Sequence, residues 1–332
     1  MRRQLVLLAA LILFVAYFIS SFLLRGDPPS ASPLMESKQA IPVTVLTYNI
    51  HSCVGSDGVY SVERIVAVLR EANADIVCLQ EVEVNDKSIQ TTRLWSKPHQ
   101  DDQVAIIAAQ AGYSYSKFAP AIRSIANHHD GTEVFLPFDS SQGGMFGVAL
   151  LSKWPIINSK VLRFAPYAQK TPRNALVCQI EIPTTCASAT TSSDNDDCAD
   201  TTKTIWVIST HLGMHPPGGE QLQQAKELRL FIENLLLSPQ QQHSNSNNKT
   251  NTKIILAGDF NSPRWFPSIK ELKRVLAEAN RHNHGTFPAT GLFSGSLKLD
   301  YIFHNVVCTD TQVQLNRAVA SDHLAFYGSL LV

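Results

Sequence analysis

The sequence has no excess of charge of either sign. Its 332 residues include 28 basic and 28 acidic side chains, and the isoelectric point is near 7.2. Nucleases that track a polynucleotide gain affinity by neutralising phosphates with clustered Lys and Arg. The balance of charge therefore disfavours a nucleic-acid partner, although it leaves room for a local basic groove.

Internal repeats are absent, and the chain has only six cysteines. A chain of this length with 44% hydrophobic residues can bury a large core and does not depend on disulfide bonds. The even number still permits three bridges. We expect a bridge between Cys186 and Cys198, which flank a polar, acidic insert. We expect Cys78 and Cys178, which lie inside apolar runs, to be free buried thiols.

A long apolar run occupies residues 5–24 and contains no charged side chain. Its 20 residues would span the hydrocarbon core of a bilayer as a helix at about 1.5 Å per residue. This length favours a transmembrane signal anchor over a signal peptide cleaved near residues 30–32, which would release a secreted protein. Asn248 begins an N-glycosylation acceptor, which suits a domain in the secretory pathway.

The charges that flank this run predict its orientation. Arg2 and Arg3 precede it, so residues 1–4 are expected in the cytoplasm. Residues 25–40 contain proline and serine without a periodic pattern and read as a flexible stalk. The remaining domain, residues 41–332, would then be the lumenal or extracellular part of a single-pass membrane protein.

Four apolar, largely β-branched segments each stop abruptly at a polar side chain. They read as buried strands and occupy residues 43–49, 75–81, 204–211 and 253–261. If the four strands share one sheet in like orientation, their polar ends converge on one edge. Oxygen ligands and histidines would then surround one cavity, as in a magnesium-assisted hydrolase.

The rest of the domain mixes helices with paired strands. Helices are expected from Ser61 and over residues 102–111, 219–237 and 268–279, with strands over 157–163 and 174–182. Residues 120–143 are polar and read as a loop beside the cleft. The later strands pair like hairpins, which favours an α/β sandwich of two mixed sheets over a purely parallel sheet.

Six motifs occur in an informative order: LTYNIH at 46–51, LQEVE at 79–83, STHLG at 209–213, LAGDFNS at 256–262, LDYIF at 299–303 and SDH at 321–323. In this order they resemble the endonuclease/exonuclease/phosphatase superfamily, over residues 43–332. The resemblance implies a DNase I-like fold, a four-layer sandwich of two mixed β-sheets flanked by helices. It also implies a metal-dependent hydrolase acting on phosphoric ester bonds.

The resemblance assigns roles to the polar residues in these motifs. Asn49, Glu81 and Asp322 would bind Mg²⁺, or Mn²⁺ in its place, with Glu81 as the principal ligand. His51 stands two residues after Asn49, where some branches carry an acid that aids metal binding. Metal affinity would then depend mainly on Glu81.

The same resemblance assigns the chemistry of the reaction. Asp259 would orient or deprotonate water, Asn261 would donate to a phosphate oxygen, Asp300 would orient His323, and His211 would act as a second acid or phosphate donor. The planar fork of Arg173 suits a phosphate group, although a solvated surface arginine is an equally good reading of the sequence.

The function expected is that of a monomeric, membrane-anchored phosphodiesterase or phosphatase. Its substrate would be a phosphodiester or phosphomonoester, such as a lipid headgroup or GPI-type glycolipid, because the TYNIH form resembles a branch that includes proteins of GPI-anchor lipid remodelling. A secreted or lumenal nuclease and a non-catalytic binding module on the same fold are the alternatives. Apolar loops at the cleft would favour a lipid, with Trp154, Trp265 and Phe266 as candidates.

Overall fold

The computed structural model describes residues 40–85, 93, 96–127, 130, 132–137, 140, 143–168, 171–183, 202–215, 217–237, 252–280, 285–314 and 318–332. These residues build one compact unit, Ile41–Val332. The apolar run 5–24, the Cys186 and Cys198 pair and Asn248 lie outside the described residues. Within the part of the chain that is described, no helix combines the length and apolar character required to cross a bilayer.

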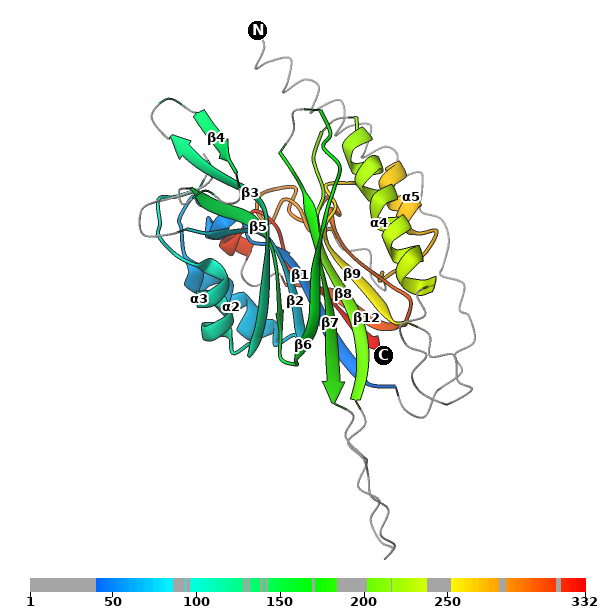
Figure 1. The fold of residues 1–332 in the computed structure, drawn as a ribbon. Coiled ribbons are helices and arrows are strands. Elements are labelled where there is room, and N and C mark those ends of the chain that lie inside the picture. The colour runs from blue at the N-terminus through cyan, green and yellow to red at the C-terminus, as the bar shows by residue number, and fades with distance from the viewer. Residues whose placement is uncertain are drawn as a thin grey trace, which may run out of the picture. The chain divides into compact units, whose positions relative to one another are not determined.

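A seven-stranded mixed sheet contains the two ends of the domain (Figure 1), in the order β12-β13-β1-β2-β5-β3-β4. Its strands are β1 (Pro42–Asn49), β2 (Ile76–Val84), β3 (Tyr115–Asn127), β4 (Thr132–Leu136), β5 (Gly144–Ser152), β12 (Val307–Val313) and β13 (Phe326–Leu331). β1 and β2 are parallel, so Asn49 lies opposite Gln80. The carboxyl ends of these two strands therefore share one edge of the sheet.

A six-stranded sheet contains the middle of the chain, in the order β10-β11-β9-β8-β7-β6. Its strands are β6 (Ile156–Arg163), β7 (Asn174–Pro183), β8 (Thr202–His211), β9 (Ile254–Asp259), β10 (Ala277–Glu278) and β11 (Asp300–His304). β8 runs parallel to β9 and places His211 opposite Asp259. β11 runs antiparallel to β9 and places Asp300 opposite Asp259. Three polar residues thus meet at one edge of this sheet.

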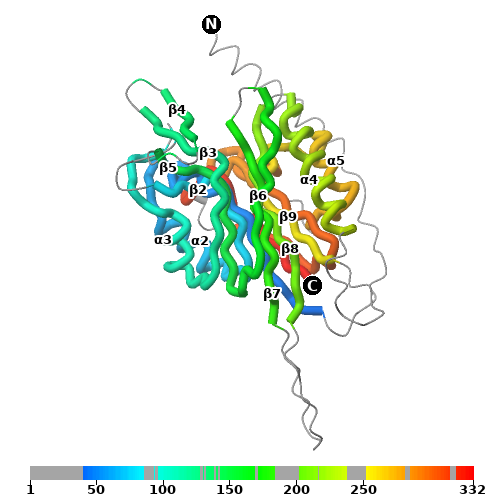
Figure 2. The backbone as a smooth tube through the Cα atoms, viewed as in Figure 1, coloured from blue at the N-terminus to red at the C-terminus, as the bar shows by residue number. Residues whose placement is uncertain are grey.

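Helices cover the outer faces of the two sheets, as the backbone trace in Figure 2 shows. They are α2 (Val62–Ala72), α3 (Gln103–Ala111), α4 (Gly219–Leu237) and α5 (Pro267–Leu272), with short 3-10 turns at His51–Cys53 and Ala318–Ala320. One apolar cluster fills the space between the sheets, a second lies under α2 and α3, and a third lies under α4 and α5. The predicted four-layer sandwich is confirmed, and the unit contains its own core.

Local signals located two of the helices correctly. Ser61 caps α2, because its side chain accepts a hydrogen bond from the Arg64 amide, and Asn73 ends it in the left-handed conformation. The buried face of α2 contains Val62, Ile65 and Leu69, at the spacing of an amphipathic helix. The predicted bounds of α4, residues 219–237, are also those observed.

The four strands with polar ends divide between the two sheets, so the condition that they share one sheet is not met. Two expectations about other elements were wrong. The predicted loop 120–143 instead contains the end of β3 and all of β4, and the β3–β5 register shifts just after Pro120, at an irregularity where a sheet tolerates proline. The predicted helix 268–279 ends at Leu272, because the chain turns to pair β10 with β11.

The cysteines that the structure describes are buried, and Cys53, Cys78 and Cys178 among them are free thiols. This confirms the prediction for Cys78 and Cys178, which pack in the cluster between the sheets. Burial raises the pKa of the Cys178 thiol to about 12, so this group stays protonated and behaves as a small apolar side chain.

Candidate active site

The amide of Asn49 joins the two sheets at their polar edges. Its Nδ2 donates to Oε1 of Glu81 at 3.1 Å and to Oδ2 of Asp259 at 3.0 Å. Its Oδ1 accepts from the His51 backbone N–H at 3.0 Å. One buried side chain therefore connects the end of β1 with an acid of each sheet, and this contact brings the predicted site residues together.

Glu81 lies at a β-bulge rather than at the end of its strand, which corrects the sequence reading. β2 continues to Val84, and the register shifts between Leu79 and Val82. Glu81 itself has φ +56°, a conformation that costs free energy in a residue with a side chain. The bulge re-aims the Glu81 carboxylate away from the alternation of the strand and toward Asn49.

Asp259 ends β9 and is buried beside Asn261. The two residues are not in extended chain as expected, because Asn261 has φ +46°. They are joined by a hydrogen bond instead, from the Asn261 backbone N–H to Oδ1 of Asp259 at 2.8 Å. Burial raises the pKa of the Asp259 carboxyl to about 7, while nearby His323 acts in the opposite direction. Asp259 can therefore gain and lose a proton near neutral pH.

His323 is paired with Asp300, as predicted. Its Nδ1 lies 2.8 Å from Oδ2 of Asp300, and its Nε2 lies 3.8 Å from Oδ2 of Asp259. Burial alone would lower the pKa of His323, but the carboxylates of Asp300 and Asp259 outweigh it and raise that pKa to about 10. His323 is consequently an imidazolium at neutral pH, held between two acids.

His211 and Arg173 form a second pair of nitrogen donors beside Asp259. Nη1 of Arg173 lies 3.1 Å from Nδ1 of His211, and Nε2 of His211 lies 3.5 Å from Oδ2 of Asp259. Burial and the neighbouring Arg173 hold the pKa of His211 well below its ordinary value, so its ring is neutral. Arg173 lines the site and is not a solvated surface arginine.

The proton of the neutral His211 ring can be assigned from its partners. A neutral imidazole accepts at one nitrogen and donates at the other, whereas a guanidinium only donates. Arg173 therefore makes Nδ1 the acceptor and leaves the proton on Nε2, on the side of Asp259 and Asn261. Nδ2 of Asn261 lies 3.0 Å from this Nε2 and donates to the Leu212 carbonyl oxygen, also at 3.0 Å.

Asp322 lies apart from the other acids. Its Oδ1 is 3.9 Å from Nδ1 of His51, and it lines a cavity of about 460 Å³ that also contains His51, Lys97, Phe287 and Thr290. The metal-ligating side chains within 4.8 Å of one another in the described part of the chain are Asp259, Asp300 and His323. The predicted ligands Glu81 and Asp322 therefore do not share this compact cluster.

Sequence reasoning missed a buried network centred on Glu83. Its carboxylate lies 2.9 Å from Nε2 of His99 and accepts hydrogen bonds from Ser52 at 3.1 Å and from Ser96. Gln103 connects the Glu83 backbone N–H with the Ser52 carbonyl, at 2.7 and 3.0 Å. The network holds the turn His51–Cys53, whose three residues all have positive φ. The only signal in the sequence was a second glutamate two residues after Glu81.

The donor set suits a divalent cation. Oε2 of Glu81 and Oδ1 of Asp300 are buried and have no hydrogen-bond partner within the described structure. Buried carboxylate oxygens need a partner, and Mg²⁺ and similar hard ions bind carboxylate and amide oxygens. The unpartnered Oε2 of Glu81 fits such an ion, whereas the Asn49 amide turns its NH2 toward Glu81 and its oxygen toward the His51 N–H.

Comparison with known proteins agrees with this geometry. The family model described as the Endonuclease/Exonuclease/phosphatase family matches residues 46–323. The curated proteins contain no match to the chain. Solved structures that match it include an endonuclease/exonuclease/phosphatase from Beutenbergia cavernae, at 21% identity and TM-score 0.59, covering 88% of this chain and 72% of the other.

Two further solved structures share the fold. A mannosyl-6-phosphatase from Bacteroides thetaiotaomicron is 16% identical with TM-score 0.55, covering 87% of this chain and 100% of its own. The catalytic domain of human nocturnin, with a bound sulfate anion, is 18% identical with TM-score 0.53, covering 88% of this chain and 95% of its own. The family model spans most of the domain, and the expected acids, amides and imidazoles meet at one edge. The chain therefore belongs to the endonuclease/exonuclease/phosphatase family, whose members are metal-dependent hydrolases of phosphate esters.

Proposed function

We propose that this chain is a membrane-anchored phosphodiesterase or phosphatase whose catalytic domain faces the lumen or exterior and whose substrate is a lipid headgroup or GPI-type glycolipid. The observation that carries the hydrolase proposal is the double hydrogen bond of Asn49 to Glu81 and Asp259, which unites the polar edges of both sheets. The membrane placement rests on the apolar run at residues 5–24.

The proposed cofactor is Mg²⁺, with Mn²⁺ as the alternative ion. Glu81 would hold it, with Asn49 hydrogen-bonded to that carboxylate, and Asp322 stands farther out beside His51. When bound, a divalent cation polarises a phosphoryl oxygen and stabilises the negative charge that develops on it.

Asp259 and His323 supply proton transfer from the chain itself. A carboxyl with a pKa of about 7 is suited to accept a proton from an attacking water at neutral pH. His323 is held charged and oriented by Asp300, so that Nε2–H faces the site and can donate to an oxygen of the phosphate ester.

His211, Arg173 and Asn261 supply donors for the phosphoryl oxygens. Burial lowers the pKa of the Arg173 guanidinium, which still has the carboxylates of Glu81 and Asp259 nearby to favour its charge. Arginine offers two parallel N–H groups that match a phosphate. The Nε2–H of a neutral His211 would point to the same region, and these donors would hold the substrate in place while Asp259 acts on water.

The cavity beside Asp322 offers a place for the alcohol portion of the substrate. It is next to His323, because the Phe287 ring that lines it lies 5.0 Å from the His323 ring. Its walls combine the Phe287 ring with the polar side chains of Lys97 and Thr290. An aromatic face with a few polar groups suits a polar headgroup.

The test is hydrolysis of a panel by purified residues 41–332 with Mg²⁺: a phosphoinositide, a GPI glycolipid, sphingomyelin, DNA and RNA. We expect lipid hydrolysis that EDTA abolishes and that falls about 10²-fold or more in Asp259→Asn, since proton transfer contributes at least that factor. Turnover in EDTA would contradict the mechanism. Hydrolysis of DNA or RNA alone would favour a nuclease, and binding without turnover would favour a binding module.

A further inference from the structure

Large apolar side chains are exposed at the edge of the domain that holds the active site. They come from six separate segments, and we call them together the apolar rim: Val59, Val134, Phe135, Met214, Trp265, Leu292, Phe293 and Val319. Leu292 is 92% exposed and Met214 is 68% exposed. Of the three aromatic residues expected on exposed loops, Trp265 is exposed, Phe266 is half-buried and Trp154 packs against the core between the sheets.

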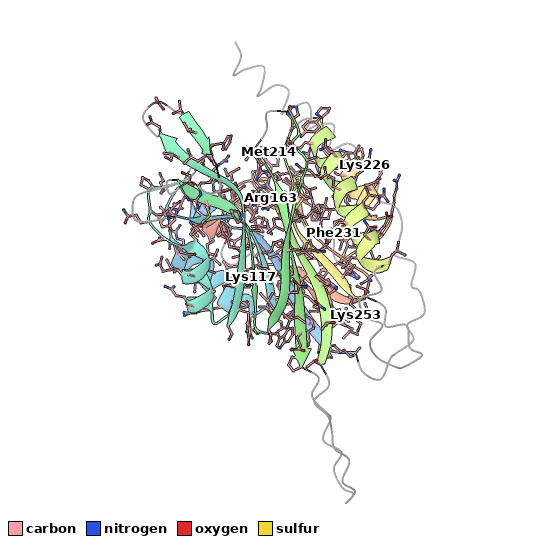
Figure 3. All side chains as sticks on the ribbon, in the orientation of Figure 1. Lys117, Arg163, Met214, Lys226, Phe231 and Lys253 are labelled. Carbon is pink, nitrogen blue, oxygen red and sulfur yellow. The ribbon has the colours of Figure 1, made fainter. Side chains whose placement is uncertain are left out.

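The topology places the rim residues that neighbour the six-stranded sheet at the edge of that sheet where His211, Asp259 and Asp300 lie. Met214 follows His211 and Trp265 follows Asp259, at the carboxyl ends of the parallel strands β8 and β9. Leu292 and Phe293 precede Asp300, which lies opposite Asp259. Figure 3 shows Met214 at one end of the molecule and Lys253, just before β9, toward the other.

The seven-stranded sheet contributes to the same edge. Val59 follows the end of β1, and the Val319 carbonyl accepts a hydrogen bond from Ser56 in that loop. β4 pairs with the end of β3, beyond the point where β3 pairs with the start of β5. In Figure 1 this hairpin projects at the same end of the domain as the Met214 segment labelled in Figure 3.

The rim segments carry few charges, and each charge is paired within the fold. Over residues 54–60, 132–136, 212–218, 262–267, 286–297 and 318–320, the Lys, Arg, Asp and Glu side chains are Asp57, Glu133 and Arg264. Asp57 pairs with Arg64 at 2.8 Å, Glu133 with Arg93 at 3.0 Å and Arg264 with Glu278 at 2.9 Å. Contact with an apolar phase would therefore bury no unpaired charge from these segments.

We propose that the apolar rim docks on the surface of a lipid bilayer and presents the active site to a substrate within it. Apolar side chains placed singly or in pairs on separate loops and on the β4 strand suit shallow insertion among lipid headgroups and acyl chains, where no matching partner surface is needed. The apolar run at residues 5–24 of the same chain supplies the reason for a membrane to be close. The proposal rests on the proposed function in one respect, the location of the substrate in a membrane.

The experiment measures binding of purified residues 41–332 to phosphatidylcholine vesicles by sedimentation. The test variant is Met214→Asp with Leu292→Asp. Its matched control is Leu230→Asp with Leu237→Asp, at positions of α4 that are 52% and 80% exposed and outside the rim. We expect the test variant to lose about tenfold or more in vesicle partitioning, because a charged group replaces an inserted apolar one, while the control binds like the wild type.

Hydrolysis of soluble bis(p-nitrophenyl) phosphate with Mg²⁺ separates docking from catalysis. We expect both double variants to hydrolyse this probe at the wild-type rate, because none of the four substituted residues belongs to the active site. Equal vesicle binding by wild type and test variant would overturn the docking proposal and leave the hydrolase proposal standing. A change in oligomeric state of the test variant without lipid would overturn it in favour of a second copy of the chain.

Discussion

At the scale of single residues, the site depends on how burial and neighbouring charge set the proton state of each group. His211 and His323 are both buried imidazoles near Asp259, yet their pKa values shift in opposite directions. Arg173 stands beside His211 and disfavours its charge, whereas Asp300 stands beside His323 and favours it. The site therefore holds one neutral and one charged imidazole for different roles.

Replacing Asp300 with Asn should test the role of the His323 partner. Asn keeps the shape of the side chain but removes the charge that stabilises the imidazolium. We expect kcat with Mg²⁺ to fall about 10²- to 10⁴-fold, with little change in KM and in the folded structure. Asp310→Asn on β12 is the control. Unchanged turnover in Asp300→Asn, measured by steady-state kinetics, would remove Asp300 from the mechanism.

Lys298 gives a stability prediction with a defined sign. This buried lysine faces Glu278 at 3.4 Å, and burial lowers its pKa from 10.5 to about 8. Between those two values the unfolded chain binds the extra proton, so the free energy of unfolding should rise with pH over that interval. Lys298→Met removes this titration. Urea unfolding of both proteins should show the wild type gaining stability relative to the variant from pH 8 to 10.5; a constant difference would contradict the burial argument.

At the scale of elements, the sequence predicted what local patterns encode and missed what depends on distant partners. The cap at Ser61 and the bounds of α4 followed from local spacing. The division of the strands between two sheets did not follow from local spacing, because the apolar pattern of a strand does not specify which strand it pairs with. The bulge at Glu81 and the network of Glu83 with His99 also depend on contacts between segments.

Glu83→Gln should show what that network does for the site. The amide cannot replace a carboxylate that accepts from Ser52, Ser96 and His99 at once. We expect a loss of about 2–4 kcal/mol in the free energy of unfolding, since one partner of a buried hydrogen-bonded charge pair is removed. Glu63→Gln, an exposed acid in the first turn of α2, should cost less than about 0.5 kcal/mol. Chemical denaturation of both variants measures the difference, and equal losses would show that the network adds nothing.

At the scale of the whole molecule, the two sheets pack face to face over an apolar cluster, and their polar edges meet at the active site. Each sheet has one parallel pair of strands, β1 with β2 and β8 with β9, and each contributes acids to the site. The apolar cluster between the sheets therefore holds the two sheets together and fixes the distance between Glu81 and Asp259. The six motifs predicted the members of the site, but only the pairing of the sheets explains why Asn49 contacts both acids.

The prediction that belongs to the whole domain concerns a disulfide bond, because Cys53, Cys78 and Cys178 are buried free thiols inside the fold. A bridge between Cys186 and Cys198, which lie outside the described residues, is still a prediction of the sequence. A loop of this size would stabilise the fold by about 3 kcal/mol by restricting the unfolded chain. We expect a reducing agent to lower the Tm of residues 41–332 by several degrees, and Cys186→Ser to lower it similarly and abolish the response. Peptide mass mapping identifies the bridge directly, and a Tm insensitive to reduction would show that both thiols are free.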